Sequence, residues 1–173
     1  MEKFSPKSRS GKFISAREAV QLIRKGDTVA SGGFAGVGFA EEIALVLEQH
    51  YLDSVDNSSA AEAALDLTLV FAAGQGDFAK RGLNHLSHKG LVACTIGGHY
   101  GATPQLAQMA VAGEIKAYNL PQGVISHLYR DIAAGKPGHL SKVGLGTFVD
   151  PRLDGGKVND ITTEDLVELM TIG

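Results

Sequence analysis

The chain has 173 residues, of which 44% are hydrophobic and 20% charged, so it can bury the core of one domain and is not a disordered chain. Its net charge is −3 and its basic residues are scattered, which excludes an electrostatic footprint for nucleic acid or an anionic membrane. The one cysteine, Cys94, rules out an internal disulfide framework and suits a cytoplasmic protein.

The first 12 residues form a predicted polar N-terminal arm, and residues 13–173 form the predicted domain. The basic stretch near the start has no apolar run behind it, so no secretory signal peptide is expected. No apolar stretch reaches the roughly 20 residues that a membrane span needs, so we also expect no membrane partner.

The first predicted helix covers residues 14–27, ISAREAVQLIRKGD, where Ser15 and Glu18 form a capping box and Gly26 is the stop signal. Residues 27–39, DTVASGGFAGVGF, then predict a short strand that runs into glycines. This order, a strand followed by a glycine-rich loop, recurs along the chain.

The second predicted helix covers residues 40–52, AEEIALVLEQHYL. Glu41 and Glu42 fall in its first turn, where we interpret them as partners of the helix dipole rather than as acid–base groups. Residues 53–64 are poor in large apolar side chains and predict an exposed excursion.

Three further strand–glycine–helix units follow. Residues 65–77, LDLTLVFAAGQGD, form a near-continuous apolar run that is typical of a parallel strand covered on both faces. Residues 89–104 repeat the plan, with Thr103 as the N-cap of the next helix. Residues 115–123, IKAYNLPQG, predict a strand and a corner before a helix in residues 124–135.

Four such units in series predict an α/β fold with a mainly parallel sheet and helices on both faces. Ligands bind such sheets outside the carboxyl ends of the strands, so the glycine-rich strand-to-helix loops are predicted to form the ligand edge. This edge comprises Gly32, Gly33, Gly36, Gly38, Gly74, Gly76, Gly97, Gly98, Gly101 and Gln122.

The pattern changes after the last predicted helix. Residues 136–160 combine prolines, glycines and short apolar runs, which predicts a long functional loop and a hairpin that turns at residues 154–156. Residues 162–170, TTEDLVELM, have capping character but are too few to define an element.

Several other chemistries find no support in the residue pattern. The dinucleotide pattern that would begin at Gly36 and Gly38 has Glu41 in place of its third glycine, and no P-loop is present. His85 and His88 lie three apart, but no cysteine or acidic residue near them in the sequence completes a tetrahedral set, so no metal site is predicted.

Four side chains are candidates for chemistry. Cys94 lies in a predicted buried strand, where inert packing is favoured over a reactive thiol, and Ser31 lacks the G-x-S-x-G elbow of a hydrolase nucleophile. His99 lies on a ligand-edge loop, where a hydrogen-bonding role is favoured over a catalytic one. Gln122 stands in the corner Pro-Gln-Gly, which holds its amide at the mouth of the sheet, either as a functional group or as a turn residue.

Three motifs in order carry a family resemblance. Residues 26–38, GDTVASGGFAGVG, resemble the N-terminal signature of the family I coenzyme A transferases, except that Ala40 replaces the family's proline. Residues 121–123, PQG, match the family's second diagnostic corner. Residues 144–159, GLGTFVDPRLDGGKVN, are similar to the single-chain acetate or propionate CoA-transferases, which act on short-chain acyl-CoA.

The resemblance implies that CoA moves between a short-chain acyl-CoA and a carboxylate such as acetate, with coenzyme A as a substrate and no other cofactor. A glutamate forms an acyl anhydride and then a glutamyl-CoA thioester, and each step passes through a tetrahedral oxyanion. By position, the family's oxyanion donor is Gln122. The implied substrate-binding residues are Gly32, Gly33, Phe34, Gly36, Gly38, Gly98, His99 and Gly101.

The family's nucleophilic glutamate lies in a Glu-x-Gly-x-x-Gly type of motif, and none of the nine glutamates of this chain has that context. The resemblance therefore implies an N-terminal, α-type domain that needs a C-terminal catalytic domain or a β-type subunit and is inactive alone. It also implies a homo-oligomer. We expect an exposed apolar face where the second domain docks, bordered by residues 136–160.

Two other functions remain open at the level of the sequence. One is a non-catalytic acyl-CoA or carboxylate-binding module that keeps the fold without the partner domain. The other is a sugar-phosphate isomerase-like or regulatory ligand-binding α/β domain, because fold alone does not decide function.

Overall fold

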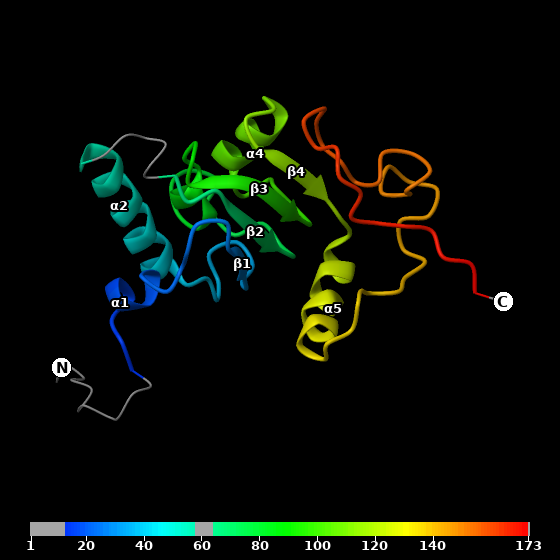
Figure 1. Cartoon of the computed structure of the whole chain (residues 1–173), viewed down its shortest axis with the longest axis horizontal. Helices are drawn as coiled ribbons and strands as arrows, with labels where there is room; N and C mark the ends of the chain where they lie inside the picture. Colours follow the sequence, from blue (N-terminus) through cyan, green and yellow to red (C-terminus); the bar gives the residue numbers. More distant parts are fainter. Residues whose placement is uncertain (1–12, 58–63, 173) are drawn as a thin grey trace.

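The computed structural model describes residues 13–57 and 64–172. Four strands form one parallel sheet in the order β1-β2-β3-β4, so neighbours in the chain are also neighbours in the sheet (Figure 1). The predicted parallel sheet is therefore confirmed. The strands are β1 (Thr28–Ser31), β2 (Leu67–Phe71), β3 (Val92–Gly97) and β4 (Lys116–Asn119).

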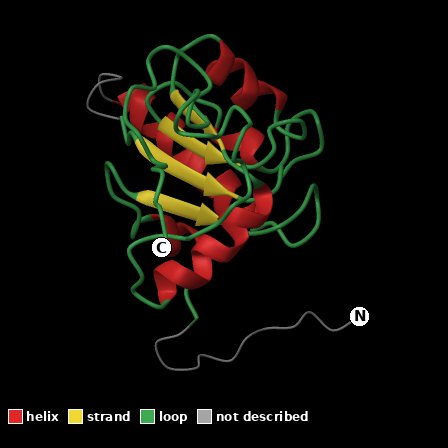
Figure 2. Cartoon of the chain, turned by 90° about the vertical axis from the view of Figure 1, so that its right-hand side faces the viewer, coloured by secondary structure: helices red, strands yellow, loops and turns green. Residues whose placement is uncertain are grey.

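Helices lie on both faces of the sheet, as predicted (Figures 1 and 2). Successive residues of a strand point to opposite faces, and β2 divides its apolar side chains in this way. Leu67, Leu69 and Phe71 join a core with α1, α2, η1 and α4, while Val70 joins a second core with α5 and the C-terminal segment. The helices are α1 (Ala16–Val20), α2 (Glu41–Asn57), the 3₁₀ helix η1 (Leu83–Leu86), α4 (Pro104–Val111) and α5 (Gln122–Ala133).

The predicted capping box of α1 is confirmed, but the predicted length of the helix is wrong. Ser15 Oγ accepts a hydrogen bond from Glu18 N at 3.2 Å, and the Glu18 carboxylate accepts one from Ser15 N at 2.8 Å. The helix ends at Val20, because Leu22 N and Ile23 N donate to carbonyls three residues back and tighten the chain into turns.

The predicted excursion in residues 53–64 is wrong for residues 53–57, which extend α2. Tyr51 is buried and Val55 packs against the same core, so this last part of the helix keeps an apolar face. Hydrogen bonds four residues apart, such as Asn57 Nδ2 to Asp53 O at 2.6 Å, support it further. Residues 58–63 lie outside the described residues.

The predicted hairpin in residues 136–160 is also wrong. The turn at residues 154–156 is present, but its second arm returns to β4 and pairs with it in the antiparallel direction through a Tyr118–Lys157 bridge. Asn119 N donates to Gly156 O at 2.8 Å, and Val158 N donates to Ala117 O at 2.9 Å. The second arm therefore pairs mainly with β4, and it keeps a local bond to the first arm, from Gly156 N to Phe148 O at 3.0 Å.

One smaller expectation also needs correction. Thr103 precedes α4 as predicted, but its hydroxyl donates to Tyr100 O at 3.0 Å and does not cap the helix. Residues 162–170 form no helix or strand. Among the described residues, no helix has both the length and the apolar character to cross a membrane.

Candidate functional site

Four loops meet at the carboxyl edge of the sheet: residues 32–38 after β1, 72–78 after β2, 97–102 after β3 and the corner 120–122 after β4. Backbone hydrogen bonds join each loop to the next. Ala35 N donates to Gly74 O at 2.8 Å, Gly98 N to Phe71 O at 3.0 Å, and Leu120 N to Gly97 O at 3.1 Å. The structure therefore brings the predicted residues to one edge, while their role in ligand binding stays a prediction.

Gln122 is the first residue of α5, and its side chain is exposed. Pro121 lies just before it with φ −57° and ψ 128°, which turns the chain from strand to helix. The amide of Gln122 makes no hydrogen bond to any of the described residues, so both its donor and its acceptor are available. This arrangement suits either a ligand-binding amide or a turn residue in solvent, so the role of Gln122 as an oxyanion donor stays a prediction.

Gly98 places the β3 loop directly against Gln122. A Cβ on Gly98 would lie 2.9 Å from Gln122 Cα and 2.1 Å from Ala72 O, and both of these are backbone atoms. Only a residue without a side chain allows this approach. The position of the Gln122 amide therefore depends on Gly98.

The loop after β1 holds two apolar side chains at its tip. Phe34 and Val37 exchange two backbone hydrogen bonds of 2.9 Å each, which close a tight turn. Their side chains are 66% and 75% exposed, so the loop presents apolar surface beside the glycine edge. Gly32, Gly33, Gly36 and Gly38 belong to this same loop.

His99 and Gly101 lie in the loop after β3. The His99 ring packs over Gly74, where a Cβ would lie 2.6 Å from its Nδ1, and against Gly101, where a Cβ would lie 2.7 Å from its Cε1. The ring is exposed and makes no hydrogen bond within the described part of the chain. It therefore covers the glycines of this edge, and its predicted hydrogen-bonding role stays a prediction.

The sequence interpretation missed Gln75. This amide is only 1% exposed, and it binds the end of β1, since its Oε1 accepts from Ser31 Oγ at 2.6 Å. In the sequence, Gln75 stands between two glycines after a predicted buried strand. This setting resembles that of Gln122, and it was the signal that could have identified Gln75. The Ser31 hydroxyl is thus a hydrogen-bond donor to Gln75 in this structure.

His85 and His88 meet carboxylates from α2, which the local sequence did not reveal. His85 Nδ1 lies 2.6 Å from Glu48 Oε2, His85 Nε2 lies 3.0 Å from Glu41 Oε1, and His88 Nε2 lies 2.7 Å from Glu48 Oε1. Glu41 also accepts from Gly82 N at 2.9 Å, which adds to its predicted place in the first helical turn. These contacts tie η1 to α2, and no group of side chains suited to a metal ion is found among residues 13–57 and 64–172.

Two carboxylates face the two ring nitrogens of His85, so the ring must carry both protons to donate to both. Burial opposes this charge, but the hydrogen bonds to Glu48 and Glu41 outweigh it and raise the pKa of His85 above its ordinary 6.5. Because the pKa of His85 is higher in the folded state than in the unfolded state, the protonated ring stabilises the fold. This stabilisation is complete below the unfolded-state pKa of His85 and is lost as the pH rises through its folded-state pKa.

We therefore expect the melting temperature of the wild type to fall between about pH 6 and about pH 9. The melting temperature of His85→Gln should fall by less over the same interval, because glutamine has no proton to lose. The matched control is His50→Gln, because His50 is an exposed histidine of α2. It should keep the wild-type pH dependence. The same pH dependence in wild type and His85→Gln would contradict the assignment of a charged His85.

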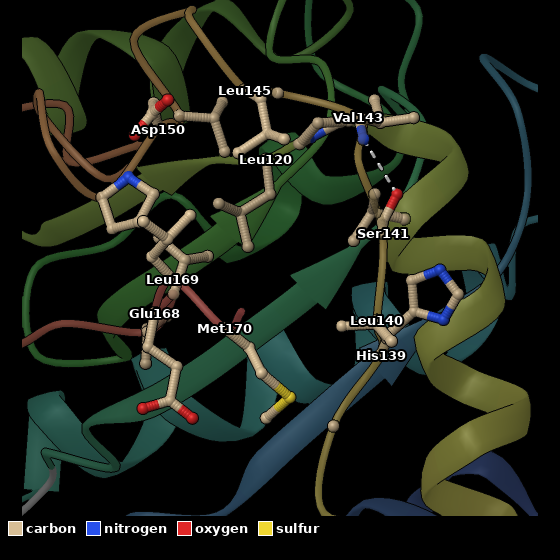
Figure 3. Close-up of a pocket in the computed structure, with 18 of the residues that line it drawn as sticks. Leu120, His139, Leu140, Ser141, Val143, Leu145, Asp150, Glu168, Leu169 and Met170 are labelled. Carbon is tan, nitrogen blue, oxygen red and sulfur yellow. Dashed lines mark hydrogen bonds between the residues drawn. The ribbon is translucent and has the colours of Figure 1, made fainter. Parts of the chain in front are cut away.

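A cavity of about 870 Å³ lies elsewhere, between α5 and the C-terminal segment in residues 137–170 (Figure 3). Its wall is mainly apolar, and Pro121 is the point at which it adjoins the glycine edge. Leu120, Leu140, Val143, Leu145, Leu169 and Met170 are among its lining residues. We assign the candidate site to the glycine edge, because Gln122 and the four loops converge there.

Two carboxylates, Asp131 and Asp150, form ion pairs beside this cavity. The carboxylate of Asp131 accepts from Lys136 Nζ and His139 Nδ1, both at 2.7 Å, and these contacts lower the pKa of Asp131 to about 2. Asp150 is buried, and hydrogen bonds from Arg152 and from Gly146 N hold its pKa well below the ordinary value. The segment is therefore ordered although it has no helix or strand.

Many exposed apolar side chains lie on this segment, where the sequence predicts a docking face, and their role in docking stays a prediction. Eleven large apolar side chains between residues 140 and 172 are 37% to 67% exposed, whereas Val149 of the same segment and the large apolar side chains of β2 and β4 are buried. The exposed ones are Leu140, Val143, Leu145, Phe148, Leu153, Val158, Ile161, Leu166, Leu169, Met170 and Ile172. We call these eleven side chains the C-terminal apolar surface.

A parallel sheet with helices on both faces and its loops gathered at the carboxyl edge defines an α/β protein, a class in which ligands commonly bind at that edge. Residues 13–169 match the coenzyme A transferase family, and this chain belongs to that family. The crystal structure of the acyl-CoA transferase YdiF apoenzyme from Escherichia coli O157:H7 has a TM-score of 0.83 and 37% identity, over 92% of this chain and 30% of that one.

Two relatives in sequence agree with this assignment. The caffeate CoA-transferase of Acetobacterium woodii is 43% identical over 159 residues, which are 92% of this chain and 29% of the relative. The acetate CoA-transferase subunit alpha of Escherichia coli K12 is 30% identical over 139 residues, which are 80% of this chain and 57% of that subunit. The chain thus spans less than a third of the caffeate enzyme.

Proposed function

We propose that this chain is the N-terminal, α-type domain of an enzyme that transfers CoA between a short-chain acyl-CoA and a carboxylate such as acetate. The observation that carries the proposal is the amide of Gln122, which is exposed, unpaired among the described residues and fixed by Pro121 and Gly98. Membership of the coenzyme A transferase family supplies the reaction class.

The chemistry of acyl transfer explains why an amide suits this corner. Attack on a thioester carbonyl creates a tetrahedral oxyanion, which is stabilised by hydrogen-bond donors that are already in place. A primary amide donates an N–H without acting as a competing nucleophile. The N-terminus of α5 adds the positive end of its dipole at the same position.

The nucleophile in this proposal is a glutamate outside residues 1–173. Within the chain, Glu41 lies beside the glycine edge, but its carboxylate is already engaged by His85 and Gly82 N. Coenzyme A takes part as a substrate, and no further cofactor is proposed. The partners are therefore an acyl-CoA, a small carboxylate and the domain or β-type subunit that carries the glutamate.

The C-terminal apolar surface supports the existence of such a partner. Eleven exposed apolar side chains in one segment are more than isolated surface positions require, and large exposed apolar patches mark interaction sites. We propose that the catalytic domain or subunit covers them in the complete enzyme. We also propose that the complete enzyme is a cytoplasmic homo-oligomer.

The direct test is to incubate the full-length protein with acetyl-CoA and propionate and to measure propionyl-CoA. We expect transfer by the full-length protein and none by residues 1–173 alone, because the chain offers an oxyanion donor without the nucleophile. Binding of acetyl-CoA without transfer by the full-length protein would point instead to a non-catalytic acyl-CoA-binding module. Transfer by residues 1–173 alone would show that one of their own glutamates is the nucleophile.

A further inference from the structure

The carboxyl end of β1 is held by a buried amide that is too deep to touch a substrate. Gln75 Nε2 donates to Ser31 O at 2.9 Å and to Gly33 O at 3.4 Å, while its Oε1 accepts from Ser31 Oγ at 2.6 Å. One side chain thus supplies two donors and an acceptor to the last residue of β1, Ser31, and to Gly33 in the loop that follows. No other residue type of similar size offers this combination without a charge.

The backbone on either side of Gln75 reinforces the same loop. Gly74 O accepts from Ala35 N at 2.8 Å, and Gly76 N donates to Ala35 O at 3.0 Å. The loop is therefore attached at Gly33 by the Gln75 side chain and at Ala35 by its two neighbours. Gln75 itself is fixed, because its carbonyl accepts from Leu83 N at 2.8 Å.

The third element at this point is α5, the helix that begins with Gln122. Tyr129 Oη lies 3.1 Å from Val70 O and 3.4 Å from Ser31 O, so its single hydroxyl proton is shared between the ends of β2 and β1, with Val70 O the nearer acceptor. Ser31 O therefore accepts from Gln75 and from α5 at once. Two turns of helix separate Tyr129 from Gln122.

We propose that Gln75 is a positioning residue, which sets the Gly32–Phe34 backbone at the distance from Gln122 that acyl-CoA binding requires. This inference rests on the proposed function. Replacement of Gln75 by leucine keeps most of the volume but leaves the Ser31 hydroxyl and the Gly33 carbonyl without their partner. The loop then loses its attachment at Gly33 and keeps only the backbone bonds at Ala35.

The test uses the full-length protein with Gln75→Leu, Ser31→Ala and a matched control, Thr162→Val. Thr162 is a buried polar residue, and its hydroxyl oxygen accepts a hydrogen bond from Ala117 N at 2.9 Å. Ala117 belongs to β4, so this contact lies away from the loop after β1. We expect amide hydrogen exchange in residues 32–38 to quicken about tenfold or more in Gln75→Leu and less in Ser31→Ala. Thr162→Val should leave this exchange unchanged.

Activity provides the second readout, at a temperature at which every variant is folded. We expect the KM for acetyl-CoA to rise about tenfold in Gln75→Leu, with a smaller change in kcat, because the loop acts in binding. Ser31→Ala should show a smaller rise in KM, and Thr162→Val should match the wild type.

Three results would overturn the inference. The first is unchanged exchange in residues 32–38 in both Gln75→Leu and Ser31→Ala. The second is faster exchange with an unchanged KM, which would make Gln75 a structural residue only. The third is an equal rise in KM in Thr162→Val, which would trace the effect to general destabilisation. A wild type that transfers no CoA would instead overturn the proposed function, and the exchange rates would still show whether Gln75 holds the loop.

Discussion

Gln122→Ala in the full-length enzyme is expected to slow the acyl-transfer steps by about 10²–10³, because the oxyanion loses one prearranged N–H donor. The stability should change by no more than about 0.5 kcal/mol, since the exposed amide has no partner among the described residues to leave unpaired. Single-turnover formation of the enzyme–CoA thioester measures the rate, and thermal unfolding measures the stability. Gln122→Glu should be at least as damaging, because its carboxylate repels the oxyanion.

The chain supplies a matched control for this variant. Gln105 also follows a proline in the first turn of a helix, α4, and its side chain is also exposed. Gln105→Ala should therefore leave the rate unchanged. If Gln122→Ala retains the wild-type single-turnover rate, Gln122 is only a turn residue and the proposed oxyanion donor must be sought elsewhere.

Gly98→Ala is expected to destabilise the protein by about 3 kcal/mol, at the upper end of the usual cost of overpacking. The new Cβ would meet Ala72 O at 2.1 Å and Gln122 Cα at 2.9 Å, and neither backbone atom can rotate away as a side chain would. The start of α5 must move, so activity should also fall at temperatures at which the variant is folded. Chemical denaturation measures the first effect, and steady-state transfer measures the second.

Gly123→Ala is the control for Gly98→Ala, because Gly123 lies on the other side of the same glutamine. Nothing lies within 4 Å of a Cβ at Gly123, and the residue belongs to α5. Alanine should therefore stabilise the helix there by about 0.5–1 kcal/mol. Equal stability of Gly98→Ala and wild type would contradict the close contact between the β3 loop and α5.

The sheet and its loops could be predicted because their signals are local. The strands β2 and β3 lie in apolar runs, and each of the four strands is followed by glycines or by the Pro-Gln-Gly corner. The continuation of α2 to Asn57 could not be read in this way, because it depends on a core that forms only when η1 and β2 pack against the helix. The sequence of residues 53–57 is polar except for Val55.

The parts of the site that were missed depend on residues far apart in the chain. Gln75 and Ser31 are 44 residues apart, as are His85 and Glu41, while His85 and Glu48 are 37 apart. No local pattern shows that such side chains meet. Gln122 could be identified from the sequence because the residues that constrain it, a proline on one side and a glycine on the other, are its direct neighbours in the chain.

The return of the chain to β4 limits how the sheet can grow. Ala117 N donates to Thr162 Oγ1, Ala117 O accepts from Val158 N, and Asn119 N donates to Gly156 O, so the outer edge of β4 is occupied. An occupied edge offers no template for an added strand, which is the common route to edge-to-edge aggregation. Among the described strands, β1 has a neighbour on one side only. A strand from elsewhere that joined this sheet would therefore pair along β1, next to the loop that carries Phe34.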